Sequence, residues 1–385
     1  MPKPTSASNW SGICVPLPSE AQRLRGIELS LIRKVTQAAP PGAINLALGE
    51  LGFPLPQILR EEALRLLQTA TPVYTPNAGL SELRSAIAAL YPGSDPEDIC
   101  VCNGAEEALF VSLLSILDTG DAVAIPDPDY PAYAAICALL EAKVVRLPYL
   151  ESLQAADLDE WERLIAGGVE VLVLSHPSNP AGHVFSEADA RRLACLCEEY
   201  EVTLVVDEIY RELFFCDPLP SFHGHLENLI LLGGVSKSHC MSGWRLGWAL
   251  VPPTLSAAVV KARQYVSTCS NWLSQQLAIY ALSPLGGAAA EEVLDQLKTC
   301  RAQALERLGH FGGRLLAPPA TPYLMLKVDA DDLDICARLA KKGVVCVPGS
   351  AFGKVSRGWL RLNYAVPNTK LATGLDIICD ELHFH

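Results

Sequence analysis

The chain has 385 residues, of which 50% are apolar and 19% charged, a composition typical of a globular protein with about two or three domains. Its net charge of −13 differs from the basic balance of most nucleic-acid binders, so we expect no nucleic-acid partner. MPKPTSASNWSG at the N-terminus lacks the apolar core of a signal peptide, and no apolar run of about 18 residues occurs. We therefore expect a cytoplasmic protein without a membrane contact. The 13 cysteines lack the spacing of metal ligands, which predicts buried thiols and no metal.

The first 45 residues are rich in proline and then become helical in pattern, with EAQRLRGIELSLIRKVT at residues 20–36. We expect this segment to be an arm that packs on the C-terminal part of the chain or on a partner subunit.

Short apolar runs then alternate with helical patterns between residues 99 and 251. The runs are ICVC (99–102), AVAI (122–125), EVLVLS (170–175), VTLVV (202–206), LILLG (229–233) and LGWALV (246–251). Continuous apolar strands separated by helices predict a mainly parallel sheet with both faces covered. In such a sheet ligands bind at the carboxyl ends of the strands.

Residues 255–310 have a helical pattern, and a smaller α+β unit follows from about residue 320. That unit contains PYLMLKV, a helix at DLDICARLAKKG, then VVCVPG, WLRLNYA and a final helix. We predict an arm at 1–45, a large domain at 46–280 and a small domain at 281–385.

Three turns that follow predicted strands carry groups able to bind a ligand. In NGAEEAL, Gly104 permits close backbone approach, and the free N–H groups of Ala105 and Glu106 form an anion site at a helix start. Tyr130 in DPDYPAY is placed to stack on a planar ligand, and Asn179 in HPSNPAG to donate to a ligand oxygen. Taken singly, each is also explained by an ordinary turn or a rim tyrosine.

Asp207 ends the apolar run LVVD, where an ionised carboxylate is costly unless it meets a cation. A protonated ring nitrogen is one such cation, and an arginine is the other. Tyr210 follows three residues later and can face the same ligand.

VSKSHCMSGWRLGW places Lys237 and Arg245 just after a strand. A lysine amine beside another cation has a lowered pKa, which favours a nucleophile able to form a Schiff base. Arg245 suits a phosphate, and Arg361 in the apolar run WLRLNYA suits a substrate carboxylate. Lys237 alone is also explained as a surface charge. Together, the set is what pyridoxal 5′-phosphate requires.

The sequence resembles the class I/II aminotransferases, which are fold-type-I pyridoxal-phosphate-dependent enzymes, over roughly residues 42–366. Besides the turns above, the resemblance rests on GAINLALGELGFPLP (42–56), YTPNAGLSELRSAIA (74–88) and VPGSAFG (347–353). It implies an α/β fold, with a large domain built on a mainly parallel seven-stranded sheet in an α/β/α sandwich and a smaller α+β domain. It also implies a homodimer that moves an amino group between an L-amino acid and a 2-oxo acid.

The resemblance implies a role for each residue of the set. Lys237 would be the Schiff-base lysine and proton carrier, and Asp207 would pair with the pyridinium nitrogen. The remaining assignments are phosphate contacts from Gly104, Ala105, Glu106, Ser236 and Arg245, stacking by Tyr130, contacts of Asn179 and Tyr210 with the 3′-oxygen, binding of the substrate carboxylate by Arg361 near Gly49, and Tyr74 reaching the phosphate of the neighbouring subunit.

The chain departs from the family pattern three residues before the lysine, where Gly234 replaces the usual Ser or Thr. The phosphate is therefore expected to lose one hydroxyl ligand, worth about 1 kcal/mol, unless water replaces it.

Other chemistries at the same site stay open at this stage. A β-eliminating C–S lyase, a cyclase or a decarboxylase would need the same residues, and a cofactor-sensing regulator is a distant alternative. Residues 267–278 contain no arginine, which disfavours aspartate as substrate. Trp10, Trp272 and Tyr323 are candidates for an apolar pocket, although ordinary packing explains each of them.

Overall fold

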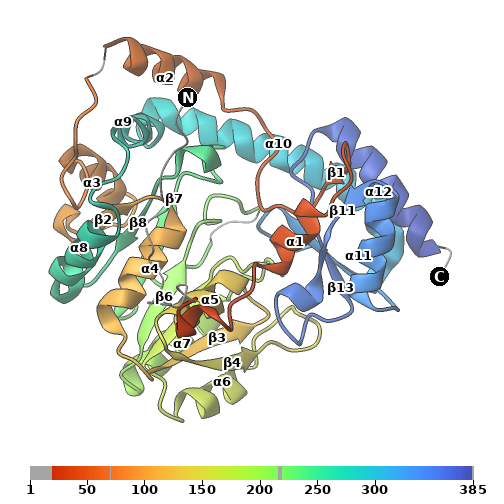
Figure 1. Cartoon of the computed structure of the whole chain (residues 1–385), viewed down its shortest axis with the longest axis horizontal. Coiled ribbons are helices and arrows are strands. Elements are labelled where there is room, and N and C mark those ends of the chain that lie inside the picture. The colour runs from red at the N-terminus through yellow and green to blue at the C-terminus, as the bar shows by residue number, and fades with distance from the viewer. Residues whose placement is uncertain (1–19, 70, 216–218, 384–385) are drawn as a thin grey trace, which may run out of the picture.

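The computed structural model of the chain describes residues 20–69, 71–215 and 219–383. Its strands form a seven-stranded sheet, a four-stranded sheet and a two-stranded pair (Figure 1). Trp10 lies outside the described residues.

The seven-stranded sheet has the order β2-β8-β7-β6-β5-β3-β4. Among these described strands β8 alone runs opposite to the other six, so the predicted mainly parallel sheet is confirmed. The strands are β2 (Ile99–Cys102), β3 (Ala122–Asp127), β4 (Lys143–Pro148), β5 (Val171–Ser175), β6 (Thr203–Asp207), β7 (Leu229–Gly234) and β8 (Gly247–Leu250). All except β4 correspond to a run identified in the sequence.

Helices cover both faces of this sheet. Successive residues of a strand point to opposite faces, so each central strand contributes side chains to a core on either side. In β5, Leu172 and Leu174 join one core, and Val171 and Val173 join another. The first core includes residues of α2 (Gln57–Thr69), α3 (Ser81–Ala88), α6 (Leu158–Ile165), α7 (Glu187–Glu199) and α9 (Trp272–Ala281). The second includes residues of α4 (Ala105–Ile116), α5 (Pro131–Leu139) and α8 (Pro253–Ser267).

The four-stranded sheet is antiparallel and has the order β12-β13-β10-β9. A third core lies between this sheet and three helices. The elements are α10 (Pro284–Leu308), β9 (Leu315–Leu316), β10 (Tyr323–Lys327), α11 (Asp332–Lys341), β12 (Val347–Pro348), β13 (Trp359–Asn363) and α12 (Asn368–His383). The domain boundaries at residues 45 and 280 stay a prediction.

The N-terminal arm is less helical than its sequence pattern predicts. The structure has only a 3-10 turn, η1 (Gln22–Leu24), and a short helix, α1 (Leu31–Gln37). Gly26 disfavours a continuous helix, and Ser30 begins a new one, since its hydroxyl accepts a hydrogen bond from the Arg33 N–H at 3.3 Å. Ile32 of α1 packs with Val345 and Phe352, and β1 (Ile44–Asn45) pairs in parallel with β11 (Val344–Val345).

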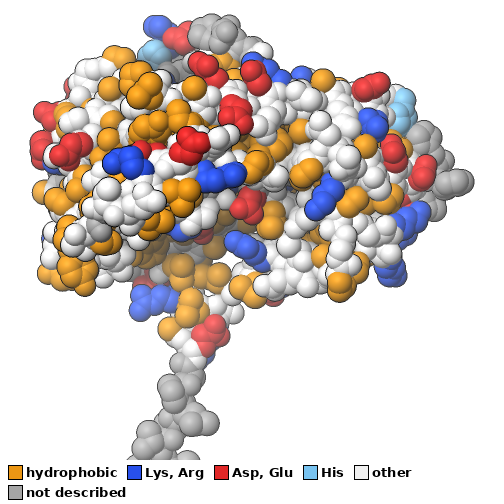
Figure 2. Space-filling model, turned by 90° about the horizontal axis from the view of Figure 1, so that it is seen from above, with side chains coloured by type: hydrophobic (Ala, Val, Ile, Leu, Met, Phe, Trp, Pro, Cys, Tyr) orange, Lys and Arg blue, Asp and Glu red, His pale blue; other side chains and the backbone are white. Residues whose placement is uncertain are grey.

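The remaining described elements are the 3-10 turns η2 (Pro96–Asp98), η3 (Ser242–Trp244), η4 (Gly309–Arg314) and η5 (Gly349–Ala351). None of the helices in the described ranges combines the length and the apolar character that a membrane span requires. On the face drawn in Figure 2, acidic and basic side chains are interspersed rather than gathered by sign.

Candidate active site

Lys237 lies just beyond the carboxyl end of β7, and its amine donates a hydrogen bond to the carbonyl oxygen of Gly49. Burial lowers the pKa of Lys237 to about 8; the nearby Glu50 opposes this change, and the guanidinium of Arg245 adds to it. A lysine with this pKa carries a substantial neutral fraction near physiological pH, which a nucleophile or a general base needs.

Gly49 belongs to the segment Ala47–Glu50, named the strap, which is also hydrogen-bonded to side chains of β13. Arg361 donates to the carbonyl of Ala47, and the side-chain amide of Asn363 donates to the carbonyls of Leu48 and Glu50, at 2.7 Å for the latter. The hydroxyl of Ser242 donates to the Glu50 carboxylate at 2.6 Å. The strap therefore joins the four-stranded sheet to the loop that carries the lysine.

Asp207 ends β6, the strand beside β7, and is 8% exposed. Its carboxylate accepts hydrogen bonds from the Tyr133 hydroxyl at 2.9 Å and the Ile209 N–H at 3.0 Å. Burial raises its pKa. A cation close to Asp207 would offset the desolvation of the carboxylate and keep it ionised.

A second buried carboxyl group, Asp129, is hydrogen-bonded to Ser175, the residue of β5 that pairs with Asp207. Little in the sequence indicated it. Its Oδ1 accepts hydrogen bonds from the Ser175 hydroxyl and from the Tyr130 N–H, both at 2.7 Å. Burial raises the pKa of Asp129 to about 8, and Asp207 acts in the same direction. The only sequence signal was a second aspartate in DPDYPAY.

Four tyrosines lie around Asp207 and Gly49. The Tyr130 ring meets Tyr133 edge to face, with 5.6 Å between their centroids. The hydroxyls of Tyr210 and Tyr323 are 2.6 Å apart, and a Cβ at Gly49 would collide with the Tyr323 hydroxyl. A side chain at position 49 would therefore displace Tyr323 from its contact with Tyr210.

Trp272, the other pocket candidate among the described residues, instead packs against the core that contains residues of α2 and α9. Ordinary packing accounts for it, whereas Tyr323 does join the site.

Arg361 is 1% exposed and lies between two aromatic rings, with its Cζ 4.2 Å from the centroid of Tyr323 and 4.7 Å from that of Phe352. One of its terminal nitrogens donates to Asn179 Oδ1 at 2.8 Å. Its buried Nε has no hydrogen-bond partner among the described residues. An unpaired guanidinium N–H is costly unless a ligand anion accepts from it.

A candidate anion site lies where Arg245 meets the first turn of α4. The guanidinium donates to the carbonyl oxygens of Asn103 and Ser242, each at 3.2 Å. Gly104 is the N-cap of α4, and beyond it the N–H groups of Ala105 and Glu106 have no acceptor within the helix. A guanidinium and a helix N-terminus together suit a phosphate group.

Replacing Gly104 by alanine should weaken binding at this anion site. Its φ is +96°, and an added Cβ would lie 2.5 Å from a terminal nitrogen of Arg245. We expect a loss of about 1–3 kcal/mol in the free energy of unfolding, together with weaker binding of inorganic phosphate. Urea unfolding and a phosphate titration measure the two effects. Gly287→Ala is the control, because that glycine lies within α10 with nothing within 4 Å; equal behaviour of the two variants would contradict the prediction.

Comparison with known proteins identifies the family. The family model for aminotransferase class I and II matches residues 41–378. The aspartate aminotransferase of Thermotoga maritima is 31% identical over 375 residues, which cover 95% of this chain and 98% of the relative. The chain belongs to the class I and II aminotransferase family. The aromatic-amino-acid aminotransferase 2 of Thermococcus litoralis is 30% identical, covering 92% of this chain and 96% of that protein.

The fold of the solved family members agrees with this assignment. A crystal structure of the aspartate aminotransferase from Thermotoga maritima superposes with a TM-score of 0.88 at 31% identity, covering 94% of this chain and all of that one. The protein is therefore an aminotransferase of fold type I, and the fold and enzyme class expected from the resemblance are confirmed.

The departure at Gly234 has a steric basis in this aminotransferase. A Cβ at this position would lie 2.9 Å from the carbonyl oxygen of Leu246 and 3.2 Å from Cα of Gly247. The adjacent strand β8 thus occupies the space that a serine side chain would need. Ser236, directly before the lysine, is buried.

Gly234→Ser is accordingly expected to destabilise the aminotransferase by about 1–3 kcal/mol without tightening cofactor binding. Urea unfolding and a pyridoxal phosphate titration test this expectation, with Gly313→Ser as the control at a glycine surrounded by open space. A variant of unchanged stability that binds the cofactor more tightly would show that the missing hydroxyl can simply be restored.

Tyr74 differs from the other predicted residues of this aminotransferase, because its side chain is 88% exposed. Within a single subunit Tyr74 therefore lies apart from the other candidate site residues. Within the described ranges, no group of three or more His, Cys, Asp or Glu side chains could hold a metal ion.

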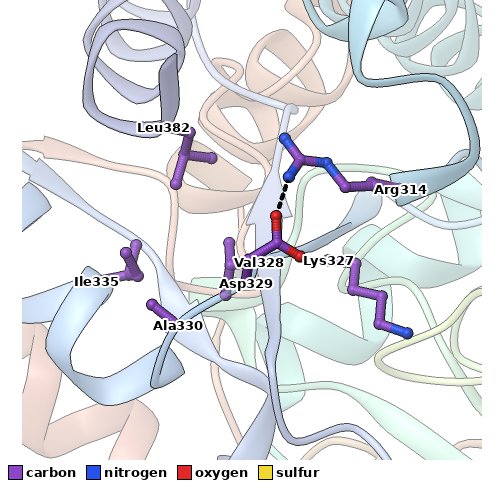
Figure 3. A pocket seen from close by; sticks show the side chains of 7 residues that line it. All are labelled: Arg314, Lys327, Val328, Asp329, Ala330, Ile335 and Leu382. Atoms are coloured by element: carbon purple, nitrogen blue, oxygen red, sulfur yellow. Dashed lines mark hydrogen bonds and ion pairs between the residues drawn. The ribbon is translucent and has the colours of Figure 1, made fainter. Parts of the chain in front are cut away.

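A separate small cavity lies at the end of β10, away from the residues above (Figure 3). It has a volume of about 50 Å³, and an Arg314–Asp329 ion pair at 2.5 Å lies on its wall. Ligand sites normally have about 300–1,000 Å³, so this cavity suits water rather than a cofactor or substrate.

Proposed function

We propose that this aminotransferase binds pyridoxal 5′-phosphate covalently through Lys237 and transfers an amino group between an L-amino acid and a 2-oxo acid. The proposal rests on one arrangement of side chains. Lys237 and Asp207 lie at the ends of the adjacent strands β7 and β6, and Arg245 lies in the connection between β7 and β8, where it contacts the start of α4. The family membership supports the same reaction.

The residues fit this cofactor at each of its polar groups. Arg245 and the α4 N-terminus offer donors for the phosphate, and the missing side chain at Gly104 leaves room beside the guanidinium. Asp207 offers a carboxylate for the ring nitrogen. Asn179 and Tyr210 would contact the 3′-oxygen, and Tyr130 would stack on the ring. When bound, the cofactor acts as an electron sink for negative charge at the substrate α-carbon.

The protein itself supplies orientation and proton transfer. Arg361 holds the substrate carboxylate, because its Nε has no hydrogen-bond partner among the described residues and its guanidinium plane is fixed by two rings. The amine of Lys237 removes the α-proton and later returns a proton, as its lowered pKa allows. Asp207 stays ionised against the positive ring nitrogen.

The reaction type is tested by supplying amino acids with and without a 2-oxo acid. We expect amino transfer that depends on the 2-oxo acid. Release of ammonia or thiol without a 2-oxo acid would instead support the lyase alternative. A panel of donors that includes aspartate and an aromatic amino acid identifies the substrate, and the absence of arginine from residues 267–278 predicts that aspartate is not preferred.

We further propose that the active form is a cytoplasmic homodimer in which Tyr74 completes the phosphate site of the partner subunit. The exposure of Tyr74 supports this, as does the exposure of Val73 (62%) and Tyr265 (83%), since such apolar surface is common at interfaces.

Mixing two defective variants tests the shared site. In a hybrid of Lys237→Ala and Tyr74→Ala subunits, one site combines an intact lysine with an intact tyrosine from the other chain. We therefore expect activity to reappear on subunit exchange. No recovery in a hybrid dimer, or full activity in a monomer, would contradict the proposal.

A further inference from the structure

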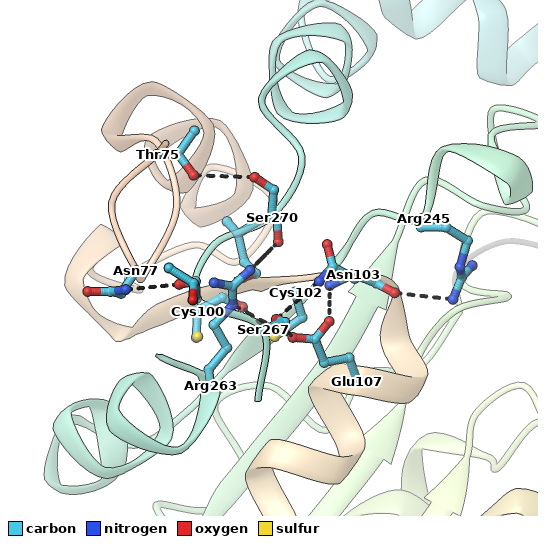
Figure 4. A network of polar contacts seen from close by, with 12 residues as sticks. Thr75, Asn77, Cys100, Cys102, Asn103, Glu107, Arg245, Arg263, Ser267 and Ser270 are labelled. Atoms are coloured by element: carbon cyan, nitrogen blue, oxygen red, sulfur yellow. Dashed lines mark hydrogen bonds and ion pairs between the residues drawn. The ribbon is translucent and has the colours of Figure 1, made fainter. Parts of the chain in front are cut away.

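The carboxylate of Glu107, in the first turn of α4, points back toward the residue that precedes the helix cap. It accepts hydrogen bonds from the Asn103 N–H at 2.9 Å and from the Ser267 hydroxyl (Figure 4). The side-chain amide of Asn103 donates to the same hydroxyl at 3.2 Å. Asn103 is therefore fixed through both its backbone and its side chain.

Arg263 forms an ion pair with Glu107. It is fully buried on α8, and its Nε lies 3.8 Å from the Glu107 carboxylate, beyond hydrogen-bond distance. One terminal nitrogen donates to the Ser270 hydroxyl at 2.7 Å, whereas Nε and the other terminal nitrogen have no hydrogen-bond partner among the described residues. A buried cation with one nearby carboxylate holds that carboxylate strongly, because separating the charges exposes both to an apolar surrounding.

The network ends at the anion site. Glu107 accepts a hydrogen bond from the N–H of Asn103. The carbonyl oxygen of the same residue accepts one from a terminal nitrogen of Arg245 at 3.2 Å. Asn103 also directly precedes Gly104, the N-cap of α4. A displacement of Asn103 would therefore move both the guanidinium and the free N–H groups of the helix start.

At its opposite end, the network reaches the segment that carries Tyr74. The Thr75 hydroxyl donates to the carbonyl of Ser270 at 3.4 Å, and the Asn77 amide donates to the carbonyl of Thr268 at 2.9 Å (Figure 4). The same loop that pairs with Arg263 thus anchors the residues beside Tyr74.

We propose that Glu107, held by Arg263, is a positioning residue for phosphate recognition, setting Asn103 and Arg245 in the geometry that a phosphate monoester requires. The inference rests on the proposed function, because it assumes that Arg245 binds the cofactor phosphate. Glu107 itself need not touch the cofactor.

Comparing pyridoxal phosphate with pyridoxal isolates the phosphate contribution. Both are titrated into cofactor-free wild-type protein and into Glu107→Gln, and the dissociation constants are measured by absorbance. We expect the constant for pyridoxal phosphate to rise about tenfold in the variant, while that for pyridoxal stays unchanged. Glu160→Gln is the control, because it breaks another carboxylate–arginine pair, the 2.5 Å contact with Arg163 on α6, a helix that packs on the opposite face of the large sheet from α4.

Ser267→Ala is the second variant, since it removes the hydroxyl that joins Asn103 to Glu107 and keeps both buried charges. We expect a smaller change in the same direction, and this variant decides the matter should Glu107→Gln fail to fold. Equal weakening of both ligands, or no weakening of either, would overturn the inference. A wild-type protein that binds neither ligand would instead refute the proposed function.

Discussion

Replacing Lys237 by alanine is expected to reduce amino transfer by at least about 10⁴-fold, because the variant loses the proposed nucleophile and proton carrier together. The fold should persist, since the lost hydrogen bond is a single contact to the carbonyl of Gly49. Steady-state turnover measures the first effect. Mass spectrometry after borohydride reduction should find the cofactor on the peptide containing Lys237 in the wild type and not in the variant.

Lys261→Ala is the matched control, because this lysine is exposed on α8. The pH dependence gives a second check. Since burial lowers the pKa of Lys237 to about 8, the neutral amine predominates above that pH. The rate of covalent cofactor capture should therefore rise with pH and level off above about pH 8. A Lys237→Ala enzyme that still turns over would refute the mechanism.

Replacing Arg361 by lysine is expected to lower kcat/KM for amino acids by about 10²–10³-fold, even though the charge is kept. An ammonium group lacks the planar pair of donors that matches a carboxylate, and it cannot lie between the rings of Tyr323 and Phe352 as a guanidinium does. The loss should fall mainly on substrate binding. Steady-state kinetics with an amino acid and with the amine that lacks its carboxylate measures it.

The amine tests the assigned role directly, because it has no carboxylate for Arg361 to bind. We expect the substitution to have little effect on the already slow reaction of the amine. Arg301→Lys is the control, since this arginine also stacks on a ring, that of Phe215 at 4.9 Å, and donates to the carbonyls of Ala317 and Pro318. An equal loss for both substrates would assign Arg361 a purely structural role.

Most of the large sheet could be predicted because its central strands are apolar on both faces. β5 and β6 sit between two cores, so each is a continuous apolar run that differs clearly from the helices around it. β4 was missed because it lies at the edge of the sheet, where Lys143 and Arg146 are exposed and the apolar run is broken.

Candidate site residues stood out in the sequence where they follow a predicted strand or where a charge interrupts an apolar run. Asp207 and Arg361 are charged residues in apolar strands, so each requires a partner. Asn363 and Glu107 carry no such signal, because their importance depends on contacts with Leu48 and Ser267, which are far away in the sequence. A single sequence does not reveal contacts of this kind. In the arm the sequence pattern predicted too much helix. The pattern is interrupted by Gly26, and the structure has one 3-10 turn and one short α-helix there.

The strap Ala47–Glu50 has a thermodynamic consequence for ligand binding. Its carbonyl oxygens solvate the Lys237 amine and one end of Arg361 in place of water. The free energy needed to remove water from these two cations is therefore expended on folding, before a substrate binds. The substrate carboxylate then adds an acceptor at the Nε of Arg361, for which the described residues supply none. Little solvent reorganisation remains for the chemical step itself.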